Sequence, residues 1–194
     1  MTKLIELTDR DRKIISFVKE FKAVNTSTIA NLYWKDCKQK QILAERRLKL
    51  LVENKKLRRD RDSILSEYYY YIGTKVPHFK HSCLIAEAYA QLKLNYDVLN
   101  YKREVQLYCR NENLKADLVV ILKKDGKPIP LIIECDISRP YAYKYDSYIT
   151  DNYWSSKFGV KPTIISISKW QPKSNIPIEY INVETFKESG LLIK

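Results

Sequence analysis

The sequence predicts a mixed α+β protein, α/β in the broad sense, built from two domains. Residues 1–76 contain three stretches with helical apolar spacing, followed by two short strand-like runs. Residues 77–194 contain a helix, three strands, a second helix and a further strand, in the order αβββαβ. A chain of 194 residues suits one large domain or two small ones, and its four glycines leave little material for flexible linkers.

Capping residues and apolar spacing predict the first two helices. Thr8 is a candidate N-cap, and Asp9 and Asp11 follow in the first turn, where the helix dipole favours anions. Apolar residues then recur at helical spacing, namely Ile14, Ile15, Phe17, Val18 and Phe21. Asn25 or Thr26 is expected to cap a second, shorter helix, TSTIANLYW.

A third helix and a hairpin complete the first domain. The helix is expected over about 38–54, with Ala44, Leu48 and Leu51 forming its buried stripe. The sequence KKLRRDRDSILSEYYYYIG then predicts two short strands around a polar turn. Three helices followed by a hairpin is the element order of a winged helix-turn-helix, in which the third helix enters the major groove of DNA.

The residues expected to contact DNA lie on the third helix, opposite its buried stripe, and on the hairpin. On the helix they are Lys38, Gln39, Arg46 and Lys49, and on the hairpin they are Arg58, Arg59 and Arg61. The hairpin arginines are expected to bind phosphates, which positions the helix without reading the base sequence. Arg46 is the best candidate for a base contact, to guanine. The alternative interpretation of the helix is a solvated basic face without a DNA partner.

The charge distribution favours the same surface. The chain carries 35 Lys and Arg against 23 Asp and Glu, a net charge of +12, and such a field attracts polyanions. Residues 1–76 carry 18 basic against 10 acidic residues, a net charge of +8. Double-stranded DNA is therefore the expected partner. An anionic membrane is disfavoured because no concentrated polybasic amphipathic helix is present.

The sequence also predicts a cytoplasmic location. The opening residues MTKLIELTDRDRKIISF carry charges throughout and do not resemble a secretory signal. No run approaches the roughly 18 apolar residues that a membrane span requires. The four cysteines are widely spaced and form no CxxC, so we expect single buried thiols in a reducing compartment.

Acidic residues at the ends of apolar strands indicate a special site in the second domain. ADLVVI and PLIIECDI are expected to be strands joined by a turn, which places Asp117 on one and Glu134 and Asp136 on the other. Carboxylates are rarely found on buried strands without partners. These acids are therefore expected either to be capped by cations and backbone groups or to bind Mg²⁺ or Mn²⁺. In the first case Asp136 caps the following helix or pairs with Arg139.

The strand order and these acids resemble the PD-(D/E)XK nuclease core, a restriction-endonuclease-like fold. In that family the residue two positions after the Glu is usually Lys, and here it is Asp136. The resemblance implies a catalytic set of Asp117, Glu134 and Asp136, with Lys144 of the following helix as a substitute cation. The missing Lys implies weak metal binding with little or no cleavage, and an active Mg²⁺-dependent endonuclease or nickase is the alternative.

Taken together, the two domains resemble the replication-relaxation family of plasmids and other mobile elements. The matching features are His81 at a helix start, Glu104, the strand that carries Asp117, the E-x-D of the next strand and the KYDSY helix. The resemblance implies a DNA-binding accessory protein of plasmid replication or conjugative transfer, with relaxase or replication proteins and a second copy of the chain as partners. A winged-helix transcriptional regulator is the alternative.

Overall fold

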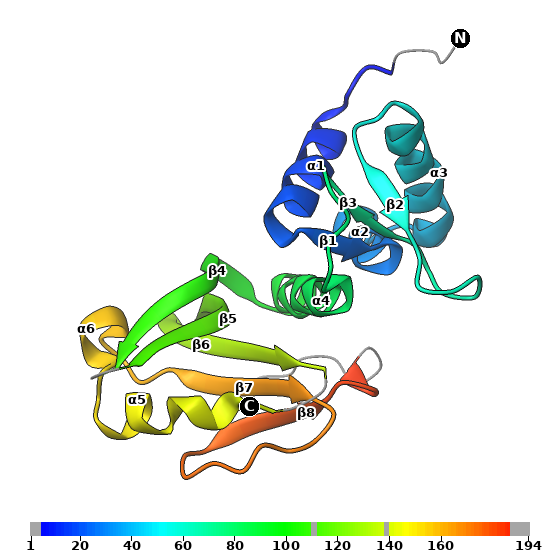
Figure 1. The fold of residues 1–194 in the computed structure, drawn as a ribbon. Coiled ribbons are helices and arrows are strands. Elements are labelled where there is room, and N and C mark those ends of the chain that lie inside the picture. The colour runs from blue at the N-terminus through cyan, green and yellow to red at the C-terminus, as the bar shows by residue number, and fades with distance from the viewer. Residues whose placement is uncertain (1–4, 110–111, 138–139, 187–194) are drawn as a thin grey trace. The chain divides into compact units, whose positions relative to one another are not determined.

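The chain folds as two compact units, Met1–Ala90 and Gln91–Lys194, and the computed structural model describes residues 5–109, 112–137 and 140–186 (Figure 1). The first unit combines helices with a small antiparallel sheet, and the second contains a five-stranded mixed sheet. The predicted mixed α+β class is therefore confirmed. The division falls inside helix α4 (Phe79–Asn95), whereas the sequence predicted a division after residue 76.

Three helices form the larger part of the first unit. They are α1 (Asp9–Phe21), α2 (Thr26–Tyr33) and α3 (Lys40–Glu53). The Asp11 backbone N–H donates to Thr8 Oγ1 at 3.3 Å and the Thr8 N–H donates to Asp11 Oδ2 at 2.7 Å, so the predicted N-cap is part of a reciprocal capping box. Ala44, Leu48 and Leu51 are fully buried, which confirms the predicted stripe of α3.

A three-stranded antiparallel sheet completes the first unit. Its strands are β1 (Ala23–Asn25), β2 (Arg58–Asp60) and β3 (Tyr69–Tyr71), in the order β1-β3-β2. The hairpin of β2 and β3 was predicted, and β1 was not, because three residues between two helices are too few to show a period of two. All three tyrosines of β3 are buried.

The first twelve residues of α4, Phe79 to Ala90, belong to the first unit. The ring of Tyr89 lies 5.9 Å from that of Phe17 and 5.2 Å from that of Phe21, measured between centroids. Thr28 Oγ1 also donates a hydrogen bond to Glu87 at 3.0 Å in a buried position. Because α4 supplies these contacts, the first unit extends to Ala90.

The second unit is built on the sheet β4-β5-β6-β7-β8. Its strands are β4 (Asp97–Cys109), β5 (Glu112–Lys124), β6 (Lys127–Asp136), β7 (Thr163–Ser168) and β8 (Ile178–Asn182). The first three pair antiparallel, and the turn between β5 and β6 uses positive φ angles at Asp125 and Gly126, of 51° and 78°. The pairs β6–β7 and β7–β8 are parallel, so each requires a crossover connection.

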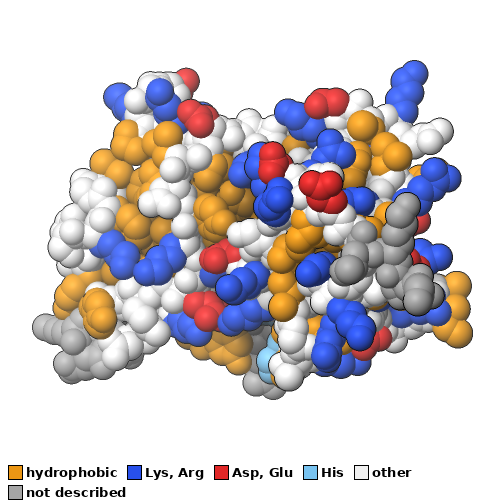
Figure 2. All heavy atoms as spheres, turned by 90° about the horizontal axis from the view of Figure 1, so that it is seen from above, with side chains coloured by type: hydrophobic (Ala, Val, Ile, Leu, Met, Phe, Trp, Pro, Cys, Tyr) orange, Lys and Arg blue, Asp and Glu red, His pale blue; other side chains and the backbone are white. Residues whose placement is uncertain are grey.

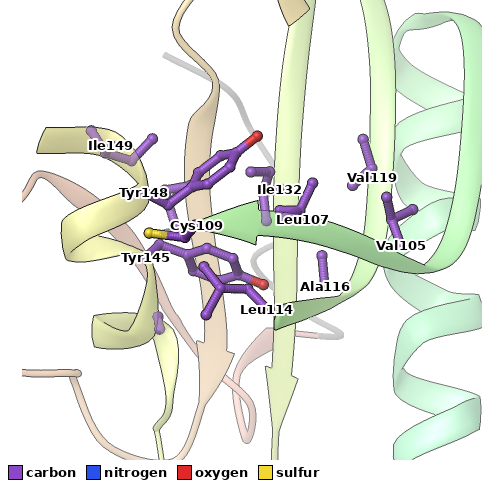
Figure 3. Packing of buried hydrophobic residues seen from close by; sticks show 12 residues of the cluster. Val105, Leu107, Cys109, Leu114, Ala116, Val119, Ile132, Tyr145, Tyr148 and Ile149 are labelled. Carbon is purple, nitrogen blue, oxygen red and sulfur yellow. The ribbon is translucent and has the colours of Figure 1, made fainter. Parts of the chain in front are cut away.

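The crossover from β6 to β7 packs aromatic side chains on the sheet. It contains a 3₁₀ turn, η1 (Ala142–Tyr145), and two short helices, α5 (Asp146–Thr150) and α6 (Ser155–Phe158), where the sequence predicted one helix. A positive φ of 60° at Asn152 separates α5 from α6. Figure 3 shows Tyr145 and Tyr148 beside strand residues of one buried cluster, which includes Leu107, Cys109, Leu114 and Ile132.

The cysteines are free thiols, as the sequence predicted, but they are not all buried. Cys83, Cys109 and Cys135 are buried, whereas Cys37 is exposed. The prediction is wrong for Cys37 because this residue lies in the exposed connection between α2 and α3 and not inside a helix or strand. Within the part of the chain that the structure describes, no helix is long and apolar enough to cross a membrane.

A buried ion pair joins α1 to α3. The side chain of Asp11 is fully buried, Arg47 Nε donates to its Oδ1 at 2.7 Å, and Arg47 Nη2 donates to its Oδ2. Burial opposes the ionisation of Asp11, but the hydrogen bonds from Arg47 and Thr8 outweigh burial and hold the pKa of this carboxyl below its ordinary value. The pair therefore fixes α3 on α1 and sets which face of α3 is turned to solvent.

Asp11→Asn should lower the free energy of unfolding by about 3 kcal/mol near neutral pH, because the partly buried guanidinium of Arg47 loses the charge that compensates it. The folded pKa of Asp11 lies below its unfolded value, so the wild-type contribution is present above about pH 4 and is lost as the pH falls through the folded pKa. Chemical denaturation at several pH values measures both effects. The matched control is Asp9→Asn, which removes the exposed pair with Arg12 and should change stability by less than about 1 kcal/mol. Equal losses in the two variants would contradict this role of Asp11.

Candidate functional site

Basic residues of α3 and of the β2–β3 hairpin meet at one groove of about 540 Å³. Arg46 and Lys49 line it from α3, Arg59 lines it from β2, and Leu65 and Tyr68 line it from the hairpin. All three basic residues are exposed. Residues that the sequence assigned separately to a helix and to a hairpin are thus brought together, and we call this surface the basic groove.

Two acidic side chains also line the basic groove, and both have partners. Glu67 accepts hydrogen bonds from the backbone N–H of Ser27 at 3.0 Å and from its hydroxyl at 3.1 Å. Glu45 accepts a hydrogen bond from Gln41 Nε2 at 3.0 Å. Because these partners are neutral, both carboxylates keep their charge, and three cations against two carboxylates give the groove a net charge of +1. Lys and Arg side chains are also widely spread over the face of the molecule drawn in Figure 2.

The three hairpin arginines do not act as one group. The guanidinium groups of Arg59 and Arg61 lie 4.3 Å and 5.2 Å from the ring centroid of Tyr68, which is cation–π stacking. Side chains alternate along β2, so Arg58 lies on the opposite face from Arg59 and shares its face with Asp60. The predicted set of three is therefore divided, and only Arg59 lines the basic groove.

The remaining predicted DNA-binding residues are exposed. Lys38 and Gln39 precede the first residue of α3, Lys40, so they lie outside the helix face on which the sequence placed them. Lys49 forms an exposed ion pair with Glu53 at 3.9 Å. Arg46 borders a second hollow of about 350 Å³ as well as the basic groove, so its side chain occupies the ridge of α3 between the two.

In the second unit, strand pairing brings two of the predicted acids together. Asp117 of β5 lies beside Glu134 of β6, and the Asp117 backbone N–H donates to Glu134 Oε1 at 3.3 Å. The carboxylate of Asp117 accepts a hydrogen bond from the Cys135 N–H at 3.0 Å. The side-chain oxygen of each acid thus contacts the backbone of the other strand, which ties the two strands together at this point.

Glu134 is a buried carboxyl with two side-chain donors. Lys144 Nζ donates to its Oε2 at 2.9 Å, and the Tyr145 hydroxyl donates to its Oε1. Burial, followed by the negative charge of Asp117, raises the pKa of Glu134 to about 7, although Lys144 and Tyr145 act in the opposite direction. Burial and the same two carboxylates raise the pKa of Tyr145, so its hydroxyl stays protonated and remains a donor.

The third predicted acid, Asp136, is directed to the backbone. Its Oδ2 accepts a hydrogen bond from the N–H of Tyr141, the residue before η1, at 2.8 Å. The alternative partner, Arg139, lies outside the described residues. Among the side chains that the structure describes, no group of three or more His, Cys, Asp or Glu comes together to hold a metal ion. The predicted three-acid set for Mg²⁺ or Mn²⁺ does not fit this geometry, because only Asp117 and Glu134 meet and Lys144 already balances Glu134.

Two features of this region were not assigned from the sequence. Tyr145 belongs to the KYDSY segment, but nothing in its spacing indicates that its hydroxyl reaches Glu134. Glu104 has a positive φ of 51°, between the β4–β5 pairs Arg103–Leu118 and Val105–Ala116 and therefore opposite Asp117. Such a backbone conformation is costly for a non-glycine residue, and strain of this kind often accompanies functional sites.

Comparisons with known proteins assign no family. No family model matches the chain, and no curated protein matches it. Among solved structures, protein VC1899 from Vibrio cholerae is similar at a TM-score of 0.36 and 11% sequence identity, over 91% of this chain and 54% of that chain. This chain thus spans about half the length of that protein, and the similarity is a distant one.

Glu134→Gln should stabilise the protein at pH 8, on the order of 2 kcal/mol, because it removes a buried charge and keeps the shape of the side chain. The folded pKa of about 7 lies above the unfolded value, so the carboxyl contributes stability that is present below about pH 4 and is lost as the pH rises through 7. Thermal unfolding of both proteins at pH 5 and pH 8 measures the difference. The matched control is Glu184→Gln, which removes an exposed carboxyl paired with Lys169 at 3.6 Å and should change stability by less than about 1 kcal/mol. A variant less stable than wild type at pH 8 would refute this account of Glu134.

Proposed function

We propose that the first unit is a winged helix-turn-helix that binds double-stranded DNA, with α3 in the major groove and the β2–β3 hairpin on the flanking backbone. The element order α1, β1, α2, α3, β2, β3 supports this assignment. The observation that carries the proposal is the convergence of Arg46, Lys49 and Arg59 at one groove from segments that are distant in the sequence.

The basic residues of the groove have different roles in binding DNA. Lys49 and Arg59 neutralise phosphates, and the release of condensed counterions drives this part of the affinity. Arg59 is held against Tyr68, so less side-chain freedom is lost when it binds a phosphate. Arg46 stands on the ridge of α3 and is the residue that reaches a base edge, where an arginine pairs best with guanine.

For the second unit, we propose a restriction-endonuclease-like core whose acids connect neighbouring strands and the crossover through hydrogen bonds and do not cleave DNA. The contacts of Asp117, Glu134 and Asp136 support this assignment, because each carboxylate accepts hydrogen bonds from the backbone or from Lys144 and Tyr145. The resemblance to the replication-relaxation family extends the proposal to plasmid replication or conjugative transfer. In that setting the second unit would contact relaxase or replication proteins, or a second copy of the chain.

A metal-dependent nuclease is the second candidate, and one observation favours it. Lys144 Nζ lies 2.9 Å from Glu134 and so places a cation beside the acids, although Asp136 stands where the nuclease family usually has Lys. Against this candidate, Asp136 is directed to the Tyr141 N–H, so the acids do not converge on one point. DNA binding without cleavage is therefore the better supported of the two functions.

Lys49→Ala combined with Arg59→Ala should weaken binding to a duplex and reduce the slope of log K against log salt by about 2, since two phosphate contacts are lost. Fluorescence anisotropy with the full chain, between about 50 and 200 mM salt, measures the slope. The matched control is Lys13→Ala combined with Lys19→Ala, which removes the same charge from exposed positions of α1 and should leave the slope nearly unchanged. Equal reductions in both double variants would show that only net charge matters. A wild-type chain that fails to bind any duplex at low salt would refute the proposal.

Supercoiled plasmid incubated with the protein and Mn²⁺ should stay supercoiled, because the three acids do not form a common site. Agarose electrophoresis measures nicking, and calorimetry with Mn²⁺ alone should show at most weak binding. Glu134→Gln is the control, and plasmid incubated with this variant should be indistinguishable from plasmid incubated with wild type. Nicking by wild type that disappears in both Glu134→Gln and Lys144→Ala would establish the nuclease candidate instead.

A further inference from the structure

The tip of the β2–β3 hairpin presents two large apolar side chains to solvent. Ile64 is 80% exposed and Leu65 is 97% exposed, which makes them the two most exposed large hydrophobic residues in the part of the chain that the structure describes. Single exposed apolar residues are common on protein surfaces and need no explanation. Two adjacent ones on the tip of a hairpin that also carries three arginines (Arg58, Arg59 and Arg61) are a different case, because they form one projecting apolar surface.

Hydrogen bonds fix the turn that carries this pair. The Ser66 N–H donates to the Ser63 carbonyl at 3.1 Å, the two serine hydroxyls lie 2.8 Å apart, and Arg61 Nη1 donates to the Ile64 carbonyl at 3.0 Å. The central positions of such a turn are usually filled by small or polar residues, because these suit turn geometry and solvent. Ile64 and Leu65 are therefore not required by the turn, and an ordered turn holds them outward.

The surroundings of the tip indicate which kind of partner would cover it. Leu65 lines the basic groove together with Arg46, Lys49 and Arg59, so the apolar tip belongs to the same surface as the cations. Arg59 and Arg61 stack on Tyr68 a few residues away. A partner that fits this surface must be polyanionic at its edges and offer an apolar space between them. A nucleic-acid duplex has both features, since its phosphates flank stacked bases.

We propose that Ile64 and Leu65 form an apolar wedge that enters the minor groove and partly unstacks a base step of bound DNA. The proposal rests on the DNA-binding function given above and adds the way in which the hairpin deforms the duplex. Proteins that insert Ile or Leu between base steps kink the DNA, which lets the protein contact more of it. Arg59 and Arg61 are the residues that would hold the phosphates beside the inserted pair.

A duplex of about 20 base pairs with repeated TpA steps is the probe, because these steps unstack most easily. One version carries 2-aminopurine at the TpA adenines, whose fluorescence rises on unstacking, and another carries a donor and an acceptor dye at its two ends. Binding of the full-length wild type should raise both the 2-aminopurine fluorescence and the energy transfer. Ile64→Ser combined with Leu65→Ser should abolish both signals and weaken binding about tenfold, with an unchanged salt slope because no phosphate contact is lost.

The matched control is Leu99→Ser combined with Val160→Ser, which removes two exposed apolar side chains of the second unit and should behave as wild type. Signals and affinity that persist in the Ile64/Leu65 variant would overturn the wedge and leave DNA binding intact. Absence of duplex binding by wild type would instead overturn the DNA-binding function and the wedge with it. Binding of wild type, but not of the variant, to phosphatidylserine vesicles, with the DNA signals kept by both, would assign the tip to a membrane and also overturn the wedge.

Discussion

The ion pair between Asp11 and Arg47 is the interaction on which the proposed DNA-binding face depends. A fully buried carboxylate is unfavourable unless its charge is compensated, and here Arg47 compensates it through two hydrogen bonds from α3 to α1. The buried stripe of α3 fixes how deeply the helix packs into the core of the first unit. The ion pair fixes the rotation of α3 about its own axis and its position along α1. Arg46, the next residue to Arg47 on the helix, is thereby turned out to solvent on the ridge of α3.

The second unit also contains a buried carboxyl with compensating partners, but here burial has the larger effect on the pKa. Glu134 is compensated by Lys144 and Tyr145, but burial and the neighbouring Asp117 outweigh them and raise its pKa to about 7. The cluster ties η1 to the central strand β6, so it positions the aromatic side chains that cover the sheet (Figure 3).

Features set by local chemistry could be predicted from the sequence, and those set by tertiary packing could not. The capping box at Thr8 depends on residues three apart, and the pairing of Asp117 with Glu134 follows from the register of one hairpin with a tight turn at Asp125 and Gly126. The direction in which the Asp136 carboxylate points depends instead on where the β6–β7 crossover begins, because its partner is the backbone N–H of Tyr141. The partnership of Asp11 with Arg47 joins residues 36 positions apart and leaves no local signal. The end of the first unit at Ala90 likewise reflects ring packing by Tyr89.

The central claim is that the first unit binds DNA through α3 and the β2–β3 hairpin. Hydrogen exchange of the full-length chain, measured with and without a saturating random-sequence duplex, tests it directly because it locates the contact on the protein. The account predicts slower exchange in residues 40–53 and 58–71 when DNA is present, and little change in strands β4 to β8. Protection confined to the second unit, or no protection anywhere at saturating DNA, would contradict it.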